Sequence, residues 1–220
     1  MWFNLKSMRR GLVACLLLAS VAANAAYIVA PDIAEEYVSL RTQVHARPDD
    51  PDLNFRFAIC LSYMGKIEEG RTALKKVREL NPDFAKQALP RYLKQLAEDP
   101  RDAKTKYRLG FLYYFNDQYD QALKVLDDVA RQPPVGQLNA WALGYMAAIK
   151  GDQKKWKEGE RLARQALAIE PDAYGLHAAL AAALKGQGRY LAAVGEFITA
   201  LNKRTEFQNY ERERFPADKR

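Results

Sequence analysis

Histidine and cysteine are scarce in this chain, which holds two of each among its 220 residues. The two histidines, His45 and His177, are far apart in sequence, and no acidic cluster has the spacing of metal ligands. The adjacent carboxylates of Asp127 and Asp128 point apart on a predicted helix, so they form no catalytic pair. We therefore expect no metal site and no cofactor.

Other signatures of catalysis are missing as well. The glycine-containing stretch at residues 185–188 is predicted to be a turn between two helices, not a phosphate-binding loop that follows a strand. Ser39 and Ser62 lie in helical patterns with no base in a suitable position. The sequence thus favours a protein that is not an enzyme.

The net charge is small and argues against nucleic acid as a partner. The formal charge is +7, and three of the basic residues are Lys6, Arg9 and Arg10. Removing residues 1–25, which contain these three and no acidic residue, lowers it to +4. This excess is spread along the chain and forms no basic cluster.

The first 25 residues have the pattern of a secretory signal. A basic start precedes an apolar run, residues 11–23, and Ala23-Asn24-Ala25 provides small residues for cleavage after Ala25. Two alternatives stay open: an uncleaved membrane anchor, since the apolar character continues to Ala30, and lipidation at Cys15. We expect a periplasmic protein, or one anchored in the inner membrane and facing the periplasm. Cys60 would then be the remaining cysteine, and we expect it to be buried in a helix.

Four stretches of the remaining chain repeat one pattern. They align when started at Pro51, Ala103, Gln137 and Tyr174. The second and third starts are 34 residues apart, the third unit carries three extra residues near 152–154, and 18 extra residues follow the first unit. A fixed period of this length indicates a stack of similar helical units.

The same residue types recur at matching places of the four units. The seventh place is large and apolar, in Phe57, Leu109, Leu143 and Leu180. The eighth place is small, in Ala58, Gly110, Gly144 and Ala181. The middle of the loop holds Gly65, Asp117, Gly151 and Gly188, residues that tolerate a left-handed backbone. An apolar residue starts the second helix of each unit, in Ile67, Tyr119, Trp156 and Tyr190.

This pattern resembles the tetratricopeptide repeat family, whose 34-residue unit is a helix–turn–helix. The resemblance covers residues 51–82 and 103–204. It implies an all-α fold: a right-handed α-solenoid of about four helical hairpins, with an extra N-terminal helix and an inserted helix. It also implies a role in binding other proteins, such as a scaffold, an assembly factor or a chaperone in a secretion, pilus or cytochrome maturation system of the cell envelope.

The expected organisation is as follows. Residues 26–50 contain a helix over 32–46, for which Asp32 and Glu35 provide a capping box. The first repeat spans 51–82, an inserted helix lies in 83–100, and repeats two to four span 101–204. Residues 205–220 form a charged tail, predicted to be a solvated extension of the last helix.

A second apolar stripe on the first helices of the units predicts the binding surface. The stripe lies about a quarter-turn from the core stripe, so these helices must meet a second partner. The family's first helices line a concave groove with this face. The predicted groove residues are Phe55, Arg56, Ile59, Tyr63, Lys104, Tyr107, Arg108, Phe111, Tyr114, Phe115, Trp141 and Tyr145.

What covers this stripe decides the function. An open stripe would be an aromatic patch for a protein or peptide partner, and Lys104 and Arg108 match two of the cations with which one branch of the family grips a peptide's terminal carboxylate. Alternatively, the inserted helix, the 32–46 helix or the tail fills the groove. A further alternative is a structural solenoid that self-associates as a homo-oligomer. A membrane enters only if the N-terminal segment stays uncleaved.

Overall fold

The computed structural model describes residues 27–134 and 136–215, which form ten helices and no strand. The predicted signal at residues 1–25 lies outside this part of the chain. The helices are α2 (Pro31–Ala46), α3 (Pro51–Tyr63), α4 (Ile67–Leu80), α5 (Phe84–Glu98), α6 (Ala103–Phe115), α7 (Tyr119–Arg131), α8 (Gln137–Asp152), α9 (Trp156–Ile169), α10 (Tyr174–Gly186) and α11 (Tyr190–Arg214). The fold is all-α, as predicted. No helix within these ranges has the length and apolarity needed to cross a bilayer.

Local sequence sets the ends of the repeat helices. The side chains of Asp50 and Asp102 accept backbone N–H groups at the start of α3 and α6, the usual N-cap arrangement. The turns of three hairpins contain a left-handed residue at the predicted place: Gly65, Asp117 and Gly188.

The third hairpin differs from the prediction. Its left-handed residue is Lys154, not Gly151, because α8 runs on through Asp152. The three extra residues of this unit therefore lengthen its first helix before the turn. Helix α8 has 16 residues, whereas α6 and α10 have 13 each.

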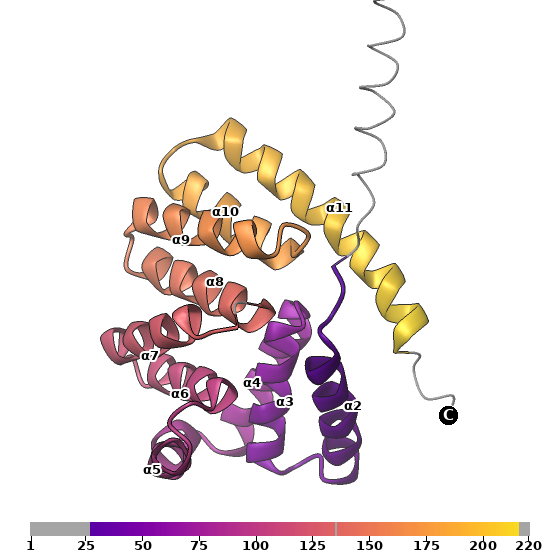
Figure 1. Cartoon of the computed structure of the whole chain (residues 1–220), viewed down its shortest axis with the longest axis vertical. Helices are drawn as coiled ribbons and strands as arrows, with labels where there is room; N and C mark the ends of the chain where they lie inside the picture. The colour runs from indigo at the N-terminus through magenta and orange to yellow at the C-terminus, as the bar shows by residue number, and fades with distance from the viewer. Residues whose placement is uncertain (1–26, 135, 216–220) are drawn as a thin grey trace, which may run out of the picture.

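The hairpins α6–α7, α8–α9 and α10–α11 stack in order and form an arc that begins at α5 (Figure 1). Small residues allow the close packing that the repeat pattern predicts. A Cβ atom at Gly110 would lie 2.8 Å from the Leu126 side chain, and one at Gly144 would lie 2.4 Å from Leu176. Bulkier residues at these places would push the helices of the arc apart.

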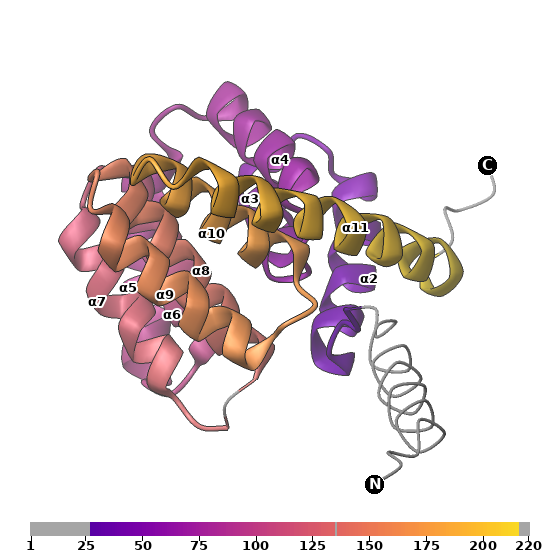
Figure 2. The same ribbon diagram turned by 90° about the horizontal axis from the view of Figure 1, so that it is seen from above.

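The hairpin α3–α4 does not stack in line with the others. The place of a second helix before α6 is taken by α5, whose buried residues are Phe84, Ala88 and Tyr92. Helix α3 instead lies against the inner face of the arc: the Tyr63 ring is 5.5 Å from that of Tyr107 on α6, and the Gly65 turn touches Trp141 on α8. The 18-residue insertion thus redirects the first hairpin (Figure 2).

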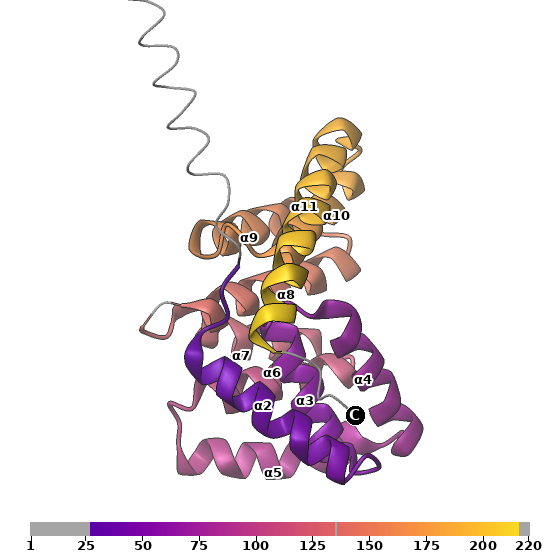
Figure 3. The same ribbon diagram turned by 90° about the vertical axis from the view of Figure 1, so that its right-hand side faces the viewer.

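Helix α11 runs past the repeats and over the N-terminal part of the chain (Figure 3). The Phe207 ring is 5.7 Å from that of Tyr27, and the Phe215 ring is 5.3 Å from that of Tyr37. Glu211 forms an ion pair with the buried Lys66 at the start of α4. Burial alone would lower the pKa of Lys66, but the carboxylates of Glu211 and Glu69 raise it above its usual value.

Two predictions about the ends of the chain need correction. Residues 205–214 continue the last helix, as predicted, but it is not solvated on every side, because Phe207 and the following Phe215 are buried against the N-terminal segment. Helix α2 begins at Pro31 without a side-chain cap, so Asp32 and Glu35 form no capping box. Proline at the first helical position provides the start instead, and Asp32 pairs with Lys104, with 3.1 Å between Oδ2 and Nζ.

Candidate functional site

Half of the predicted groove residues lie in the interior. Phe55, Ile59, Tyr63, Tyr107, Phe111 and Trp141 are all buried. Within this interior, the indole Nε1 of Trp141 donates a hydrogen bond to the Tyr27 hydroxyl at 2.9 Å, and Tyr27 donates to the Tyr63 carbonyl at 3.2 Å. Four of them, Ile59, Tyr63, Tyr107 and Trp141, line no open groove, because the chain's own α3 and residues 27–30 cover the inner face of the arc. Phe55 and Phe111 are buried but border the hollows described below.

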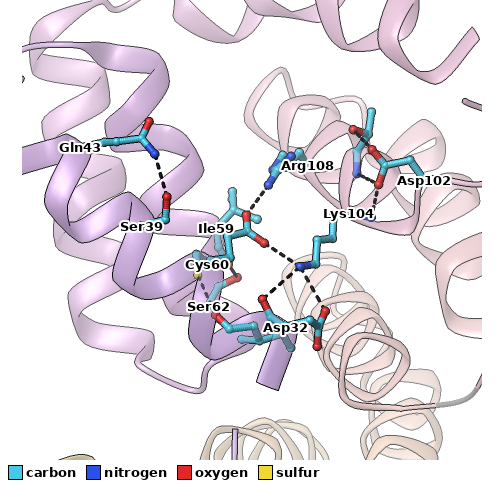
Figure 4. A network of polar contacts seen from close by, with 12 residues as sticks. Asp32, Ser39, Gln43, Ile59, Cys60, Ser62, Asp102, Lys104 and Arg108 are labelled. Atoms are coloured by element: carbon cyan, nitrogen blue, oxygen red, sulfur yellow. Dashed lines mark hydrogen bonds and ion pairs between the residues drawn. The ribbon is translucent and has the colours of Figure 1, made fainter. Parts of the chain in front are cut away.

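The two predicted carboxylate-binding residues hold a carboxylate of the same chain. Lys104 Nζ lies 2.9 Å from Glu36 Oε2, and Arg108 forms an ion pair with the other oxygen of Glu36. Glu36 comes from α2, and only 13% of its side chain and of the Arg108 side chain is exposed. Figure 4 shows Lys104 also reaching Asp32. Burial would raise the pKa of Glu36, but the Arg108 and Lys104 charges hold it below its ordinary value.

One part of the predicted groove stays open. Tyr114, Phe115 and Tyr145 are half-buried, and with Phe111 they form one wall of a cavity of about 460 Å³. Helix α4 forms the opposite wall through Ile67, Gly70, Arg71, Leu74, Lys75 and Arg78. We call this cavity the α4 cleft.

The α4 cleft combines an aromatic floor with a cationic rim. The Phe111 and Tyr145 rings pack edge to face, with their centres 4.5 Å apart. The Arg78 guanidinium lies 4.8 Å from the centre of the Phe115 ring, within the range of a cation–π contact. Arg71, Lys75 and Arg78 are exposed, and among the described side chains none that lines the cleft is acidic. Burial raises the pKa of Tyr145 to about 12, so its phenol stays neutral and can donate a hydrogen bond.

A second hollow of about 440 Å³ continues the α4 cleft toward α5 and shares Leu74, Arg78 and Phe115 with it. The two hollows exist because α4 packs on α3 but stands away from α5 and α6. The remaining predicted residue, Arg56, is half-buried and lines a separate polar hollow together with Arg108.

Sequence reasoning missed the α4 wall, because second helices of the family's repeats do not normally face the groove. The available signal was the 18-residue insertion. It separates the first hairpin from the second, so the apolar residues of α4 cannot pack on the next repeat in the usual way. Within the described residues, no group of three histidine, cysteine, aspartate or glutamate side chains could hold a metal ion.

The fold defines a class: helical hairpins stacked into an α-solenoid, here with an open cleft beside α4. A family model described as tetratricopeptide repeat matches residues 85–144, from α5 into α8. This part of the chain is therefore similar to the tetratricopeptide repeat family. Members of this family are typically scaffolds, and the match supports a role in protein–protein interaction in general terms.

Several solved structures are similar to this chain at low sequence identity, each with a TM-score below 0.5. A crystal structure of MamA is 15% identical, covering 96% of this chain and 100% of its own, with a TM-score of 0.46. MamA from Desulfovibrio magneticus RS-1 is 18% identical, covering 82% of this chain and 88% of its own, with a TM-score of 0.42. PilF of Pseudomonas aeruginosa is 15% identical, covering 76% of this chain and 93% of its own, with a TM-score of 0.46. No curated relative matches the sequence.

Proposed function

We propose that this protein is a scaffold that binds a segment of a partner protein in the α4 cleft. The observation that carries the proposal is the cleft itself. It is a part of the predicted groove that the described residues leave open, and its volume of about 460 Å³ lies within the range of pockets that hold small ligands or a few side chains.

The chemistry of the cleft suggests the kind of segment that binds. Aromatic and aliphatic walls favour a leucine-like or aromatic anchor, and such anchors supply most of the affinity at protein interfaces. Arg71, Lys75 and Arg78 at the rim favour acidic residues beside that anchor, because complementary charge raises the association rate and fixes the register. The proposed ligand is therefore an acidic segment with one or two large apolar side chains.

Site-specific photo-crosslinking in cells tests this proposal. A photoreactive amino acid at Lys75, on the exposed rim, is expected to give a discrete product with one partner protein. The same amino acid at Lys157, an exposed lysine of α9 outside the cleft, provides the matched control and is expected to give none.

A charge reversal at the rim makes the test specific. Arg78→Glu removes the contact with the Phe115 ring and places an acidic group beside the proposed acidic segment. We expect it to reduce the Lys75 crosslink about tenfold, equivalent to 1.4 kcal/mol of binding free energy, whereas Lys157→Glu leaves it unchanged. Equal labelling from both positions, or a crosslink that Arg78→Glu does not weaken, would show that the partner binds elsewhere.

We further propose that the scaffold acts in the periplasm, in a cell-envelope assembly. The signal pattern of residues 1–25 supports this location. The single cysteine of the remaining chain, Cys60, is buried, and burial raises the pKa of its thiol to about 12. Such a thiol is protected from oxidation in an oxidising compartment.

A C-terminal alkaline phosphatase fusion tests the location, because this reporter is active only after export. We expect activity from the full chain and none from a fusion in which residues 1–25 are deleted. Activity that is absent from the full-length fusion, although the fused protein is made, would contradict a periplasmic location.

A further inference from the structure

Helix α11 exposes an unusual row of large apolar side chains. Its members are Tyr190, Leu191, Val194, Phe197, Ile198 and Leu201, and Leu191 is 92% exposed. Their spacing of three or four residues places them along one helix face. We call these residues the α11 strip. The other large exposed apolar residues of the described chain, Ile28, Val38 and Leu93, each lie on a different element.

Comparison within the repeats shows that the α11 strip is more than the uncovered end of a solenoid. In α7, the places of Leu191 and Ile198 hold Asp120 and Asp127. In α9 they hold Lys157 and Arg164. These places are therefore charged in α7 and α9, the second helices that are followed by another repeat. In α11, which is followed by none, the same places hold aliphatic residues.

This replacement runs opposite to what a solvent-exposed terminal repeat requires. Terminal repeats normally carry a polar outer face, because an apolar end causes insolubility. An exposed apolar face of this extent usually marks an interaction site. The α11 strip therefore has the composition of a surface that another helix covers.

The charges around the α11 strip suit an identical partner. Glu196 is the only charged residue between Tyr190 and Leu201, and it bonds His177 on the protein side at 2.8 Å. Two basic residues at the ends of the strip are already neutralised: Arg189 pairs with Glu160 at 2.9 Å and Lys203 with Asp172 at 2.8 Å. Because each of these charges has a partner within its own chain, two copies of the strip can meet without placing unpaired charges of the same sign side by side.

The shape of the strip also suits a close helix pair. Gly195 is exposed at the edge of the strip, beside Leu191 and Ile198, and a Cβ atom there would meet nothing within 4 Å. Small residues at such places let a second helix approach closely. The strip spans 12 residues, which corresponds to roughly 18 Å of helix, enough for a continuous contact along three turns.

We propose that the α11 strip is the interface between two copies of this chain, with the two α11 helices packed antiparallel about a twofold axis. A head-to-tail contact would need a second apolar surface, and the one described, the α4 cleft of about 460 Å³, has the size for a few side chains, not for a helix face of 12 residues. A closed dimer through one self-complementary surface is the arrangement that remains, and it is the commonest form of oligomer. The strip and the α4 cleft are distinct surfaces, so either proposal can fail without the other.

Two variants test this proposal with residues that the repeats themselves use. The double variant L191D/I198D copies the charges of α7, and L191K/I198R copies those of α9. Sedimentation velocity on the full chain, up to about 100 µM, is expected to show twice the 25.0 kDa mass of one chain for the unmodified protein. Each double variant is expected to stay monomeric, with a dissociation constant raised at least about 100-fold. Unchanged melting curves would confirm that both variants are folded.

Mixing the two variants provides the decisive measurement. The acidic strip of one and the basic strip of the other are expected to pair, so the equimolar mixture regains the dimer mass. An unmodified chain that is monomeric at every concentration would overturn the proposal, as would a dimer that neither variant weakens. Binding of a different protein or of lipid vesicles by the strip of a monomeric chain would also overturn it.

Discussion

Replacing Trp141 by alanine is expected to lower the free energy of unfolding by about 3–5 kcal/mol, the usual cost of removing a fully buried tryptophan. Trp141 is 2% exposed and joins three parts of the molecule. Its Nε1 donates to Tyr27 of the N-terminal segment, and its ring lies against Gly65 of the α3–α4 turn and Gly175 of α10. The cavity left by the indole can close only partly, because two of its neighbours, Gly65 and Gly175, have no side chain that could fill it.

The reference for this prediction is Trp156→Ala, at the turn between α8 and α9. Trp156 is half-exposed, so its loss is expected to cost less, about 1–2 kcal/mol. Urea denaturation measures both values. Hydrogen exchange adds a regional readout: in Trp141→Ala the amides of α3 and α4 are expected to lose protection before those of α6 to α9. Equal costs for the two tryptophans would mean that the N-terminal hairpin is not held through Trp141.

Replacing Glu36 by alanine is expected to cost about 3 kcal/mol. The substitution leaves the buried guanidinium of Arg108 without its carboxylate, and breaking one side of a buried ion pair typically costs about 3–5 kcal/mol. The lower end applies, because Lys104 is 29% exposed and water reaches the cluster. Glu79→Ala is the matched control. Glu79 is 62% exposed and pairs only with Lys75 of its own helix, so its loss should cost about 0.5 kcal/mol or less.

The stability that Glu36 contributes to the folded state should decrease as the pH falls. Because the pKa of Glu36 is lowered from its ordinary value of 4.5, its ionised form stabilises the folded state. This contribution is complete above pH 4.5, shrinks as the pH falls below that value, and is lost once the pH passes the lowered pKa. The difference in the free energy of unfolding between the unmodified protein and Glu36→Ala should therefore decrease as the pH falls. Denaturation at a series of pH values measures it. A difference that stays constant down to strongly acidic pH would show that the charge of Glu36 does not matter.

The repeat architecture could be predicted because it depends on local sequence. Matching small and large residues, such as Gly110 opposite Leu126, specify the packing of a hairpin within a few dozen residues. The inserted helix was also predicted, and its Ala88 and Tyr92 are buried as a second helix requires.

The position of the first hairpin could not be predicted, because burial of the second stripe looks the same in sequence whether the covering group belongs to this chain or to another. Tyr107 and Trp141 needed an apolar partner, but nothing in their spacing identified α3 and Tyr27 as that partner. The predicted carboxylate-binding pair shows the same ambiguity. Lys104 and Arg108 do bind a carboxylate, and it belongs to Glu36 of α2.

Two signals were present in the sequence and carried more information than the predictions used. Phe207, Tyr210 and Phe215 recur at intervals close to one and two helical turns inside the charged tail, which indicates a buried face. Leu191 and Ile198 stand where other repeats have charges. The first signal is a periodicity within the tail, and the second requires comparison of each place with its equivalents in the other repeats.

The contact of α11 with the N-terminal segment affects how the molecule responds to force. In an open array, each repeat touches only its neighbours, so the array stretches like a spring when its ends are pulled. Here the pair of Lys66 and Glu211 and the ring contacts of Phe207 and Phe215 connect the two ends of the array directly. Tension between the termini must shear α11 from Tyr27 and Tyr37 before any hairpin can separate, so the arc is expected to keep its curvature under load.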